Sequence, residues 1–204
     1  MNKKLFLGVL GILAIFTGAT FINFVSAEKA GQTAPQISTT IVISQVYGGG
    51  GANAGTPTYK YDYVELFNLS ASPQSLDGLS IMYGSATGQF GSTAGNIAAL
   101  PSGVTLQPGQ HYLVQLGAAG TVGADLPVPP DFVSPNVTAS ATNGKIALTN
   151  GLAPNSCGAT ATPCTLPNPQ IIDLVAYGTA NNAEGNAPVA VLSNITAAVR
   201  NLNG

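Results

Sequence analysis

Apolar and polar residues alternate in short runs along most of this 204-residue chain. The alternation is clear at Tyr112, Val114 and Leu116, which are separated by Leu113 and Gln115 in a run bounded by turn residues. A period of two residues is typical of a strand with one buried face. Runs rich in β-branched and aromatic residues predict strands at residues 41–47, 61–68, 79–83, 111–116, 145–150 and 171–177, with weaker candidates at 104–106 and 188–193.

Turn-forming dipeptides separate these runs, among them Asp77-Gly78, Pro108-Gly109 and Asn143-Gly144. No stretch after residue 27 has a 3.6-residue apolar period long enough for a substantial helix, and the chain contains 25 glycines and 14 prolines. Many short strands joined by turns predict an all-β fold of the sandwich or barrel type. The length predicts a single domain, with long loops at 117–144 and 151–170.

The first 27 residues have the pattern of a secretory signal peptide. Two lysines precede an uncharged run from Leu5 to Val25, and Val25-Ser26-Ala27 forms a small-residue cleavage site. We therefore expect residues 1–27 to be removed, residues 28–40 to form a polar tether and residues 41–204 to form the domain. The alternative is an uncleaved membrane anchor, because 21 uncharged residues can just span a bilayer.

The net charge of the chain limits the classes of molecule that it can bind. Without residues 1–27 the chain has four cationic and eight acidic side chains, a net charge of −4. Such a chain has no basic stripe for a phosphate backbone or an anionic lipid surface, so we expect neither nucleic-acid binding nor membrane binding after signal cleavage.

Two cysteines, Cys157 and Cys164, are separated by six residues. In an exported chain such a pair favours a disulfide, which stabilises by about 2 to 2.5 kcal/mol through loop-closure entropy. A metal site is the alternative, but it needs further ligands and His111 is the only histidine. We therefore predict a disulfide, no metal site and no cofactor.

Four consecutive glycines, residues 48–51, follow the first predicted strand. A phosphate-binding loop would need a following helix and a Lys-Ser or Lys-Thr pair, whereas here another strand pattern follows. We expect a flexible connection between two strands. Tyr47, Tyr59 and Tyr61 cluster around it in the sequence and are candidates for an exposed aromatic surface that stacks on a ligand, with core or strand-edge tyrosines as the alternative.

No set of residues predicts catalysis. Serine-type nucleophilic catalysis needs a base beside the nucleophile, and His111 is predicted to be a surface residue on the face opposite Tyr112. Glycoside hydrolysis needs two carboxylates that face each other. Asp62 and Glu65 differ by three positions, so a strand places them on opposite faces and they cannot form such a pair. Asp125 and Asp131 lie in a proline-rich loop without calcium-loop spacing.

In their order, the motifs resemble the lamin-tail domain, and in particular its bacterial secreted branch. The motifs are "IVISQVYGGGGANAGTPTYKYDYVELFN", "SLDGLSIMY", "LQPGQHYLVQL", "GKIALTN", "IIDLVAYG" and "AEG". The resemblance covers about residues 41–200 and implies an immunoglobulin-like β-sandwich. Members usually carry Trp where this chain has Leu79, and often a cysteine where it has Ala183. Many continue past the position of "AAVRNLNG", which suggests a domain clipped at its C-terminal edge.

Two functions remain open at this stage. One is a non-catalytic secreted or envelope-associated module that binds an extracellular or envelope macromolecule, with loops 117–144 and 151–170 as contact surface. The other, implied by the resemblance, is an accessory domain of a secreted nuclease or phosphatase whose catalytic domain is missing from this chain. A single histidine cannot supply the metal site of such an enzyme.

Overall fold

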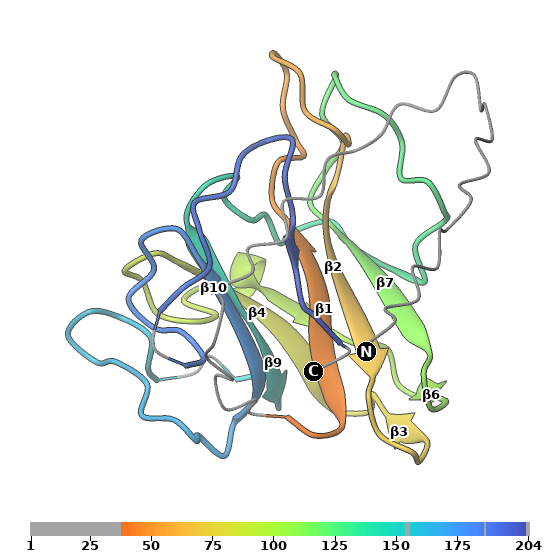
Figure 1. Cartoon of the computed structure of the whole chain (residues 1–204), viewed down its shortest axis with the longest axis vertical. Helices are drawn as coiled ribbons and strands as arrows, with labels where there is room; N and C mark the ends of the chain where they lie inside the picture. The colour runs from red at the N-terminus through yellow and green to blue at the C-terminus, as the bar shows by residue number, and fades with distance from the viewer. Residues whose placement is uncertain (1–37, 154–155, 186, 203–204) are drawn as a thin grey trace, which may run out of the picture.

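The computed structural model describes residues 38–153, 156–185 and 187–202, and these form an immunoglobulin-like β-sandwich (Figure 1). The predicted signal peptide and most of the predicted tether lie outside the described residues. The strands are β1 (Ile41–Tyr47), β2 (Asp62–Asn68), β3 (Gln74–Ser75), β4 (Leu79–Ser85), β5 (Ile97–Ala99), β6 (Thr105–Leu106), β7 (His111–Leu116), β8 (Phe132–Ser134), β9 (Gly144–Asn150), β10 (Ile171–Tyr177) and β11 (Ala198–Val199). One 3₁₀ helix, η1, spans Ala94–Asn96.

Two sheets make the sandwich. The first has the strand order β11-β1-β2-β7-β8 and the second β10-β9-β4-β5, while β3 and β6 form a small separate pair. Neighbouring strands are antiparallel except β7 and β8, which are parallel. The predicted all-β sandwich is therefore confirmed.

The core lies between the two sheets and is built by the alternating residues. Leu66 and Val114 from the first sheet and Ile81 and Ile146 from the second belong to one fully buried cluster. A β-bulge in β1 shifts its pairing with β2 between residues 43 and 45. An extra residue in a strand changes which side chains face inward, so positions on the two sides of the bulge can face the same core.

Most predicted strands are present, and one is wrong. Residues 188–193 do not form a strand: the segment contacts β10 through a single bridge from Val189 to Tyr177 and has a second bridge between Ser193 and Thr196. This segment thus runs along the edge of the sandwich without forming a regular ladder.

A second apolar cluster covers the outer face of the four-stranded sheet. Met82, Ala147 and Leu174 point outward from β4, β9 and β10 and pack against Phe90 and Cys157, which come from loops. Part of the segment 151–170, predicted to be a contact loop, therefore lies against the sheet and buries its outer face. Among the described residues, no helix is long and apolar enough to cross a membrane.

Candidate functional site

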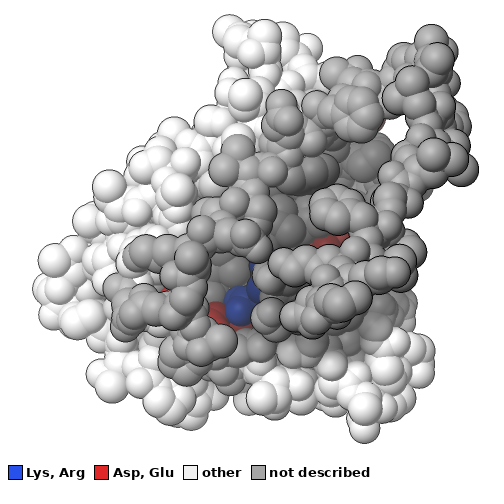
Figure 2. Space-filling model, in the orientation of Figure 1, with Lys and Arg blue, Asp and Glu red and all other residues white. Residues whose placement is uncertain are grey.

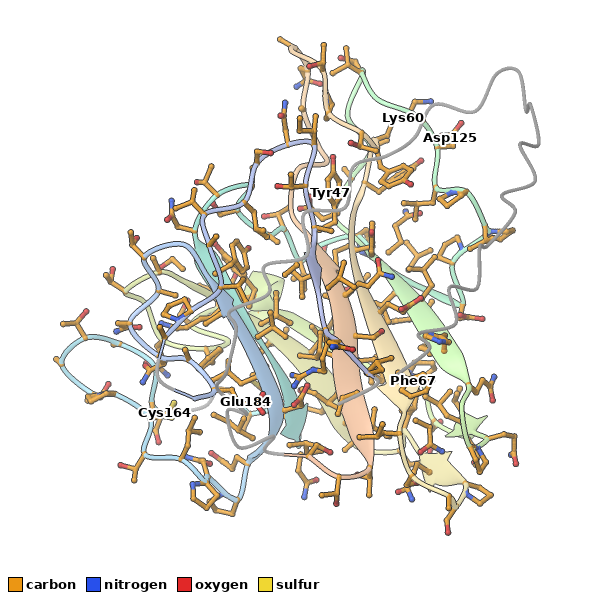
Figure 3. All side chains as sticks on the ribbon, in the orientation of Figure 1. Tyr47, Lys60, Phe67, Asp125, Cys164 and Glu184 are labelled. Atoms are coloured by element: carbon orange, nitrogen blue, oxygen red, sulfur yellow. A yellow bond between two sulfur atoms is a disulfide. The ribbon has the colours of Figure 1, made fainter. Side chains whose placement is uncertain are left out.

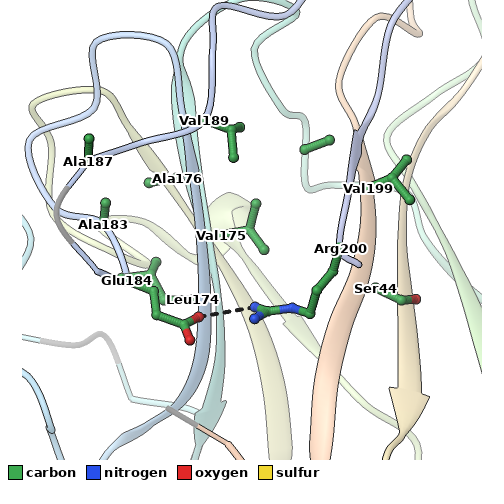
Figure 4. A pocket seen from close by; sticks show the side chains of 11 residues that line it. Ser44, Leu174, Val175, Ala176, Ala183, Glu184, Ala187, Val189, Val199 and Arg200 are labelled. Carbon is green, nitrogen blue, oxygen red and sulfur yellow. Dashed lines mark hydrogen bonds and ion pairs between the residues drawn. The ribbon is translucent and has the colours of Figure 1, made fainter. Parts of the chain in front are cut away.

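A groove lies where an edge of each sheet meets the other, between β10 and the paired strands β1 and β11. We call it the seam groove (Figure 4). It encloses about 180 Å³, and its lining is mostly small and apolar. The lining residues are Ser44, Leu174, Val175, Ala176, Ala183, Glu184, Ala187, Val189, Ala198, Val199 and Arg200.

Two charged side chains, Glu184 and Arg200, line the seam groove, and Arg200 binds both Glu184 and the buried Asp173. The Arg200 guanidinium lies 2.9 Å from Asp173 Oδ2 and 3.1 Å from Glu184 Oε2, and its Nε donates to the carbonyl oxygen of Ile43. Asp173 is fully buried, and the Ile43 amide donates to its Oδ2 at 2.6 Å. Burial raises the pKa of Asp173 to about 7, although the neighbouring Arg200 acts in the opposite direction. These ion pairs therefore fasten the edges of the two sheets together.

The rim beside the seam groove is apolar and exposed. Val189, Val191 and Val199 keep between 37% and 59% of their surface accessible. A second hollow of about 150 Å³ adjoins the groove and shares Val189 and Val199 with it. Among the atoms that are not grey in Figure 2, few belong to charged side chains. An apolar hollow with an exposed apolar rim is the kind of surface that binds another molecule.

The predicted tyrosine surface is partly an interior cluster. The ring of Tyr47 stacks on Tyr63 at a centroid distance of 5.5 Å and meets the edge of Tyr59 at 5.6 Å, and Tyr47 is only 1% exposed (Figure 3). The Tyr47 hydroxyl donates to the carbonyl oxygen of Asn194 and accepts from the Tyr59 amide. Tyr59 and Tyr61 are half-buried. Ligand stacking here stays a prediction, and Tyr59 and Tyr61 are the members that present surface for it.

The glycine run joins β1 to β2, as the sequence predicts, and its backbone packs closely against neighbouring segments. A Cβ added at Gly48 would lie 2.3 Å from the carbonyl oxygen of Ser140, and one at Gly50 would lie 2.1 Å from the carbonyl carbon of Tyr61. Backbone passes against backbone at these positions, so only glycine fits without displacing the chain. The Gly50 amide donates to the carboxylate of Asp62.

The carboxylate of Asp62 holds two loops in place through hydrogen bonds from their backbone amides. It is 4% exposed, and its two oxygens accept hydrogen bonds from the amides of Gly50 and Ala139. Burial raises its pKa to about 6. Asp62 and Glu65 have separate hydrogen-bond partners, and no interaction joins them among the described residues, in agreement with their predicted separation.

A serine, a glutamate and the histidine do meet on the outer face of the five-stranded sheet, but in an order that does not activate the serine. Ser44 Oγ donates to Glu65 Oε1 at 2.6 Å, and His111 Nδ1 lies 3.0 Å from the same oxygen. The carboxylate therefore stands between the imidazole and the hydroxyl, whereas a catalytic triad needs the imidazole against the hydroxyl. Ser44 is also only 3% exposed. The arrangement links β1, β2 and β7, and sequence reasoning missed it because the three residues are distant in sequence.

The structure joins Cys157 and Cys164 by a disulfide with an S–S distance of 2.02 Å. The loop between them reaches over Lys145, which is fully buried. No group of three or more histidine, cysteine or acidic side chains in the described part of the chain is arranged to hold a metal ion.

Comparison with known protein families identifies a match to one of them. The family model for the Lamin Tail Domain matches residues 34–179. No curated protein matches the chain.

Proposed function

This chain belongs to the lamin tail domain family, and on that premise we propose that it is a non-catalytic binding module that acts outside the cell or at the cell envelope. Its ligand is an extracellular or envelope macromolecule, which it contacts through the seam groove and the apolar rim. The seam groove is the observation that carries this proposal, because it is an accessible apolar hollow on a rigid sandwich.

The buried ionisable groups support a module without catalysis. Asp62 binds two backbone amides, Asp173 binds Ile43 and Arg200, and Lys145 binds the carbonyl oxygens of two loops. Groups committed in this way to holding the chain together cannot change partners during a reaction without loosening the fold.

Placement outside the cytoplasm is supported by the signal-like sequence of residues 1–27 and by the disulfide. Disulfides persist in oxidising compartments, whereas cytosolic thiols are kept reduced. The low number of cationic side chains favours a partner other than nucleic acid.

Hydrolysis assays test the absence of catalysis. Purified protein should leave DNA, phosphate esters and peptidoglycan intact in the presence of magnesium, calcium or zinc. Turnover of any of them that disappears in His111→Ala or Asp62→Asn would contradict the proposal. If nothing is hydrolysed and nothing binds, an accessory domain of a secreted nuclease or phosphatase becomes the better account.

A further inference from the structure

Lys145 is buried on a face of the sheet where a strand pattern predicts contact with water. Its neighbours in β9, Ile146 and Leu148, belong to the core between the sheets, so Lys145 points to the opposite face. It is nevertheless 0% exposed. Something other than the sandwich itself must therefore cover it.

Neutral oxygens surround the ammonium group of Lys145. Its Nζ donates to the carbonyl oxygen of Gly158 at 2.7 Å, to that of Ala86 at 3.3 Å and to Oδ1 of Asn181, and it lies 5.4 Å from the centroid of the Phe90 ring. No carboxylate forms an ion pair with Lys145 within the described ranges. Burial lowers its pKa to about 8. A buried ammonium without a carboxylate depends on each oxygen that binds it.

Of the two carbonyl oxygens that bind Lys145, the closer one belongs to Gly158, which lies in the loop closed by the disulfide. We call residues 157–164 the lid. Gly158 directly follows Cys157, and a Cβ at Gly158 would lie 2.7 Å from the Phe90 ring, so the lid backbone rests on that ring. The Phe90 amide donates to the carbonyl oxygen of Cys157.

Besides the disulfide, hydrogen bonds rather than apolar contacts hold most of the lid. Residues 160–163 are exposed, and Cys157 is its buried apolar side chain, packed with Met82 and Phe90. The lid also bonds to the loop after β4 through the Thr160 amide and to Asn181 through the Thr160 hydroxyl. The Asn182 side chain donates to the carbonyl oxygen of Gly158 and accepts from the amide of Cys164. A short exposed segment with few apolar contacts opens more readily when no covalent link closes it.

We propose that the Cys157–Cys164 disulfide clamps the lid over Lys145, so that the amine is sealed from water while the cysteines are oxidised and becomes accessible when they are reduced. A phosphine reductant breaks the S–S bond. The two sulfurs gain protons from water and become thiols, while the phosphorus takes the oxygen and becomes a phosphine oxide. Gly158 can then leave Lys145 and Phe90, and the outer face of the four-stranded sheet becomes exposed.

This inference is independent of the ligand of the seam groove. It makes one layer of the fold conditional on oxidation, so the chain would complete that layer only after it reaches an oxidising compartment.

Amine labelling of the full chain tests the proposal. The protein is treated with N-hydroxysuccinimidyl acetate with and without prior phosphine reduction and thiol alkylation, and acetylation of each lysine is followed by peptide mass spectrometry. Lys60 serves as the internal control, because its side chain is 32% exposed. In the oxidised protein Lys145 should react far more slowly than Lys60, and reduction should raise its rate by a factor on the order of ten or more, since a closed lid must open before the reagent enters.

Two variants separate the disulfide from other changes in the lid. Cys157→Ser/Cys164→Ser should be labelled at Lys145 as fast as the reduced protein, whereas Thr162→Ser, which keeps both cysteines, should stay protected. An unchanged Lys145 rate after verified alkylation would overturn the proposal, as would equal rates for Lys145 and Lys60 in the oxidised protein.

Hydrogen exchange shows whether the opening is local. Amides of β1 and β2 should stay protected after reduction, because these strands belong to the other sheet. Loss of their protection would mean that reduction unfolds the whole domain, which would overturn the assignment of residues 157–164 as a separate lid.

Discussion

The buried carboxylate of Asp173 accepts a hydrogen bond from the backbone amide of Ile43 at 2.6 Å, across 130 residues of sequence. Asp173 lies in β10, an edge strand of one sheet, and Ile43 in β1, next to the short edge strand β11 of the other, so this contact joins the two sheets. Arg200 completes the junction by binding Asp173 and the carbonyl oxygen of Ile43. Arg200, which lines the seam groove, is thus held by the same groups that join the two sheets.

Loss of Arg200 should destabilise the protein strongly. Arg200→Met leaves Asp173 buried without its counter-charge, and breaking a buried pair in this way costs about 3 to 5 kcal/mol. Lys60→Met is the matched control, because it removes the exposed pair with Asp125, which contributes about 0 to 1 kcal/mol. Urea unfolding of both variants at about pH 8, where Asp173 is ionised, measures the difference. Equal losses would mean that the junction at Asp173 does not hold the sheets together.

The close approach of backbone at the glycine run predicts a large effect of a single methyl group. Gly50→Ala should lower the free energy of unfolding by about 1 to 3 kcal/mol, because the added Cβ meets the backbone of Tyr61. Gly95→Ala in η1 is the control, since its Cβ would have neighbours only at 3.7 Å. Thermal unfolding compares the two. A Gly50→Ala protein as stable as the control would show that the loop is open.

Stability should depend on pH through the buried carboxyls. The pKa of Asp62 rises from a usual 3.8 to about 6 in the folded protein, and that of Asp173 to about 7. Between the usual pKa of an aspartate and these raised values, the folded state binds more protons than the unfolded state. These two groups therefore make the free energy of unfolding fall as the pH rises from about 4 to 7. Asp62→Asn should reduce that slope by at most about 1.4 kcal/mol per pH unit. Denaturant titrations at several pH values measure it, and an unchanged slope would show that Asp62 does not bind a proton on folding.

Much of the fold could be predicted from the sequence, because strands of six or seven residues carry a visible alternation. The bounds of β1, β7 and β10 agree with the prediction. Strands of two or three residues, such as β8 and β11, have too few positions to show a period. The β-branched residues at 188–193 also predicted a weak strand, where the chain runs along the edge of the sandwich as irregular structure.

The candidate site was less accessible to sequence reasoning. Asp173, Glu184 and Arg200 show no common motif, and only the meeting of two sheet edges brings them together. The burial of Lys145 was likewise hidden, because its place in the alternation of β9 indicates a wet face and the covering lid comes from a loop. Such contacts depend on tertiary packing, which local patterns do not encode.

Export predicts a defined N-terminus. If residues 1–27 act as a cleaved signal, the mature protein begins at Glu28, because Val25-Ser26-Ala27 meets the small-residue rule. These residues lie outside the described part of the structure. Intact-mass measurement of protein from the culture medium checks the cleavage, and recovery of the complete chain from Met1 in the membrane fraction would support an anchor.

Binding at the seam groove is the central claim, and retention on fractionated envelope or matrix material tests it most directly. Val199→Asp places a charge on the exposed rim of the groove, and Val133→Asp places one on β8, the opposite edge of the same sheet, where the valine is similarly exposed. Retention of the same purified component by the wild type and by Val133→Asp, with loss in Val199→Asp, is the predicted result. Equal retention of both folded variants, or no retention of the wild type on any fraction, would contradict the claim.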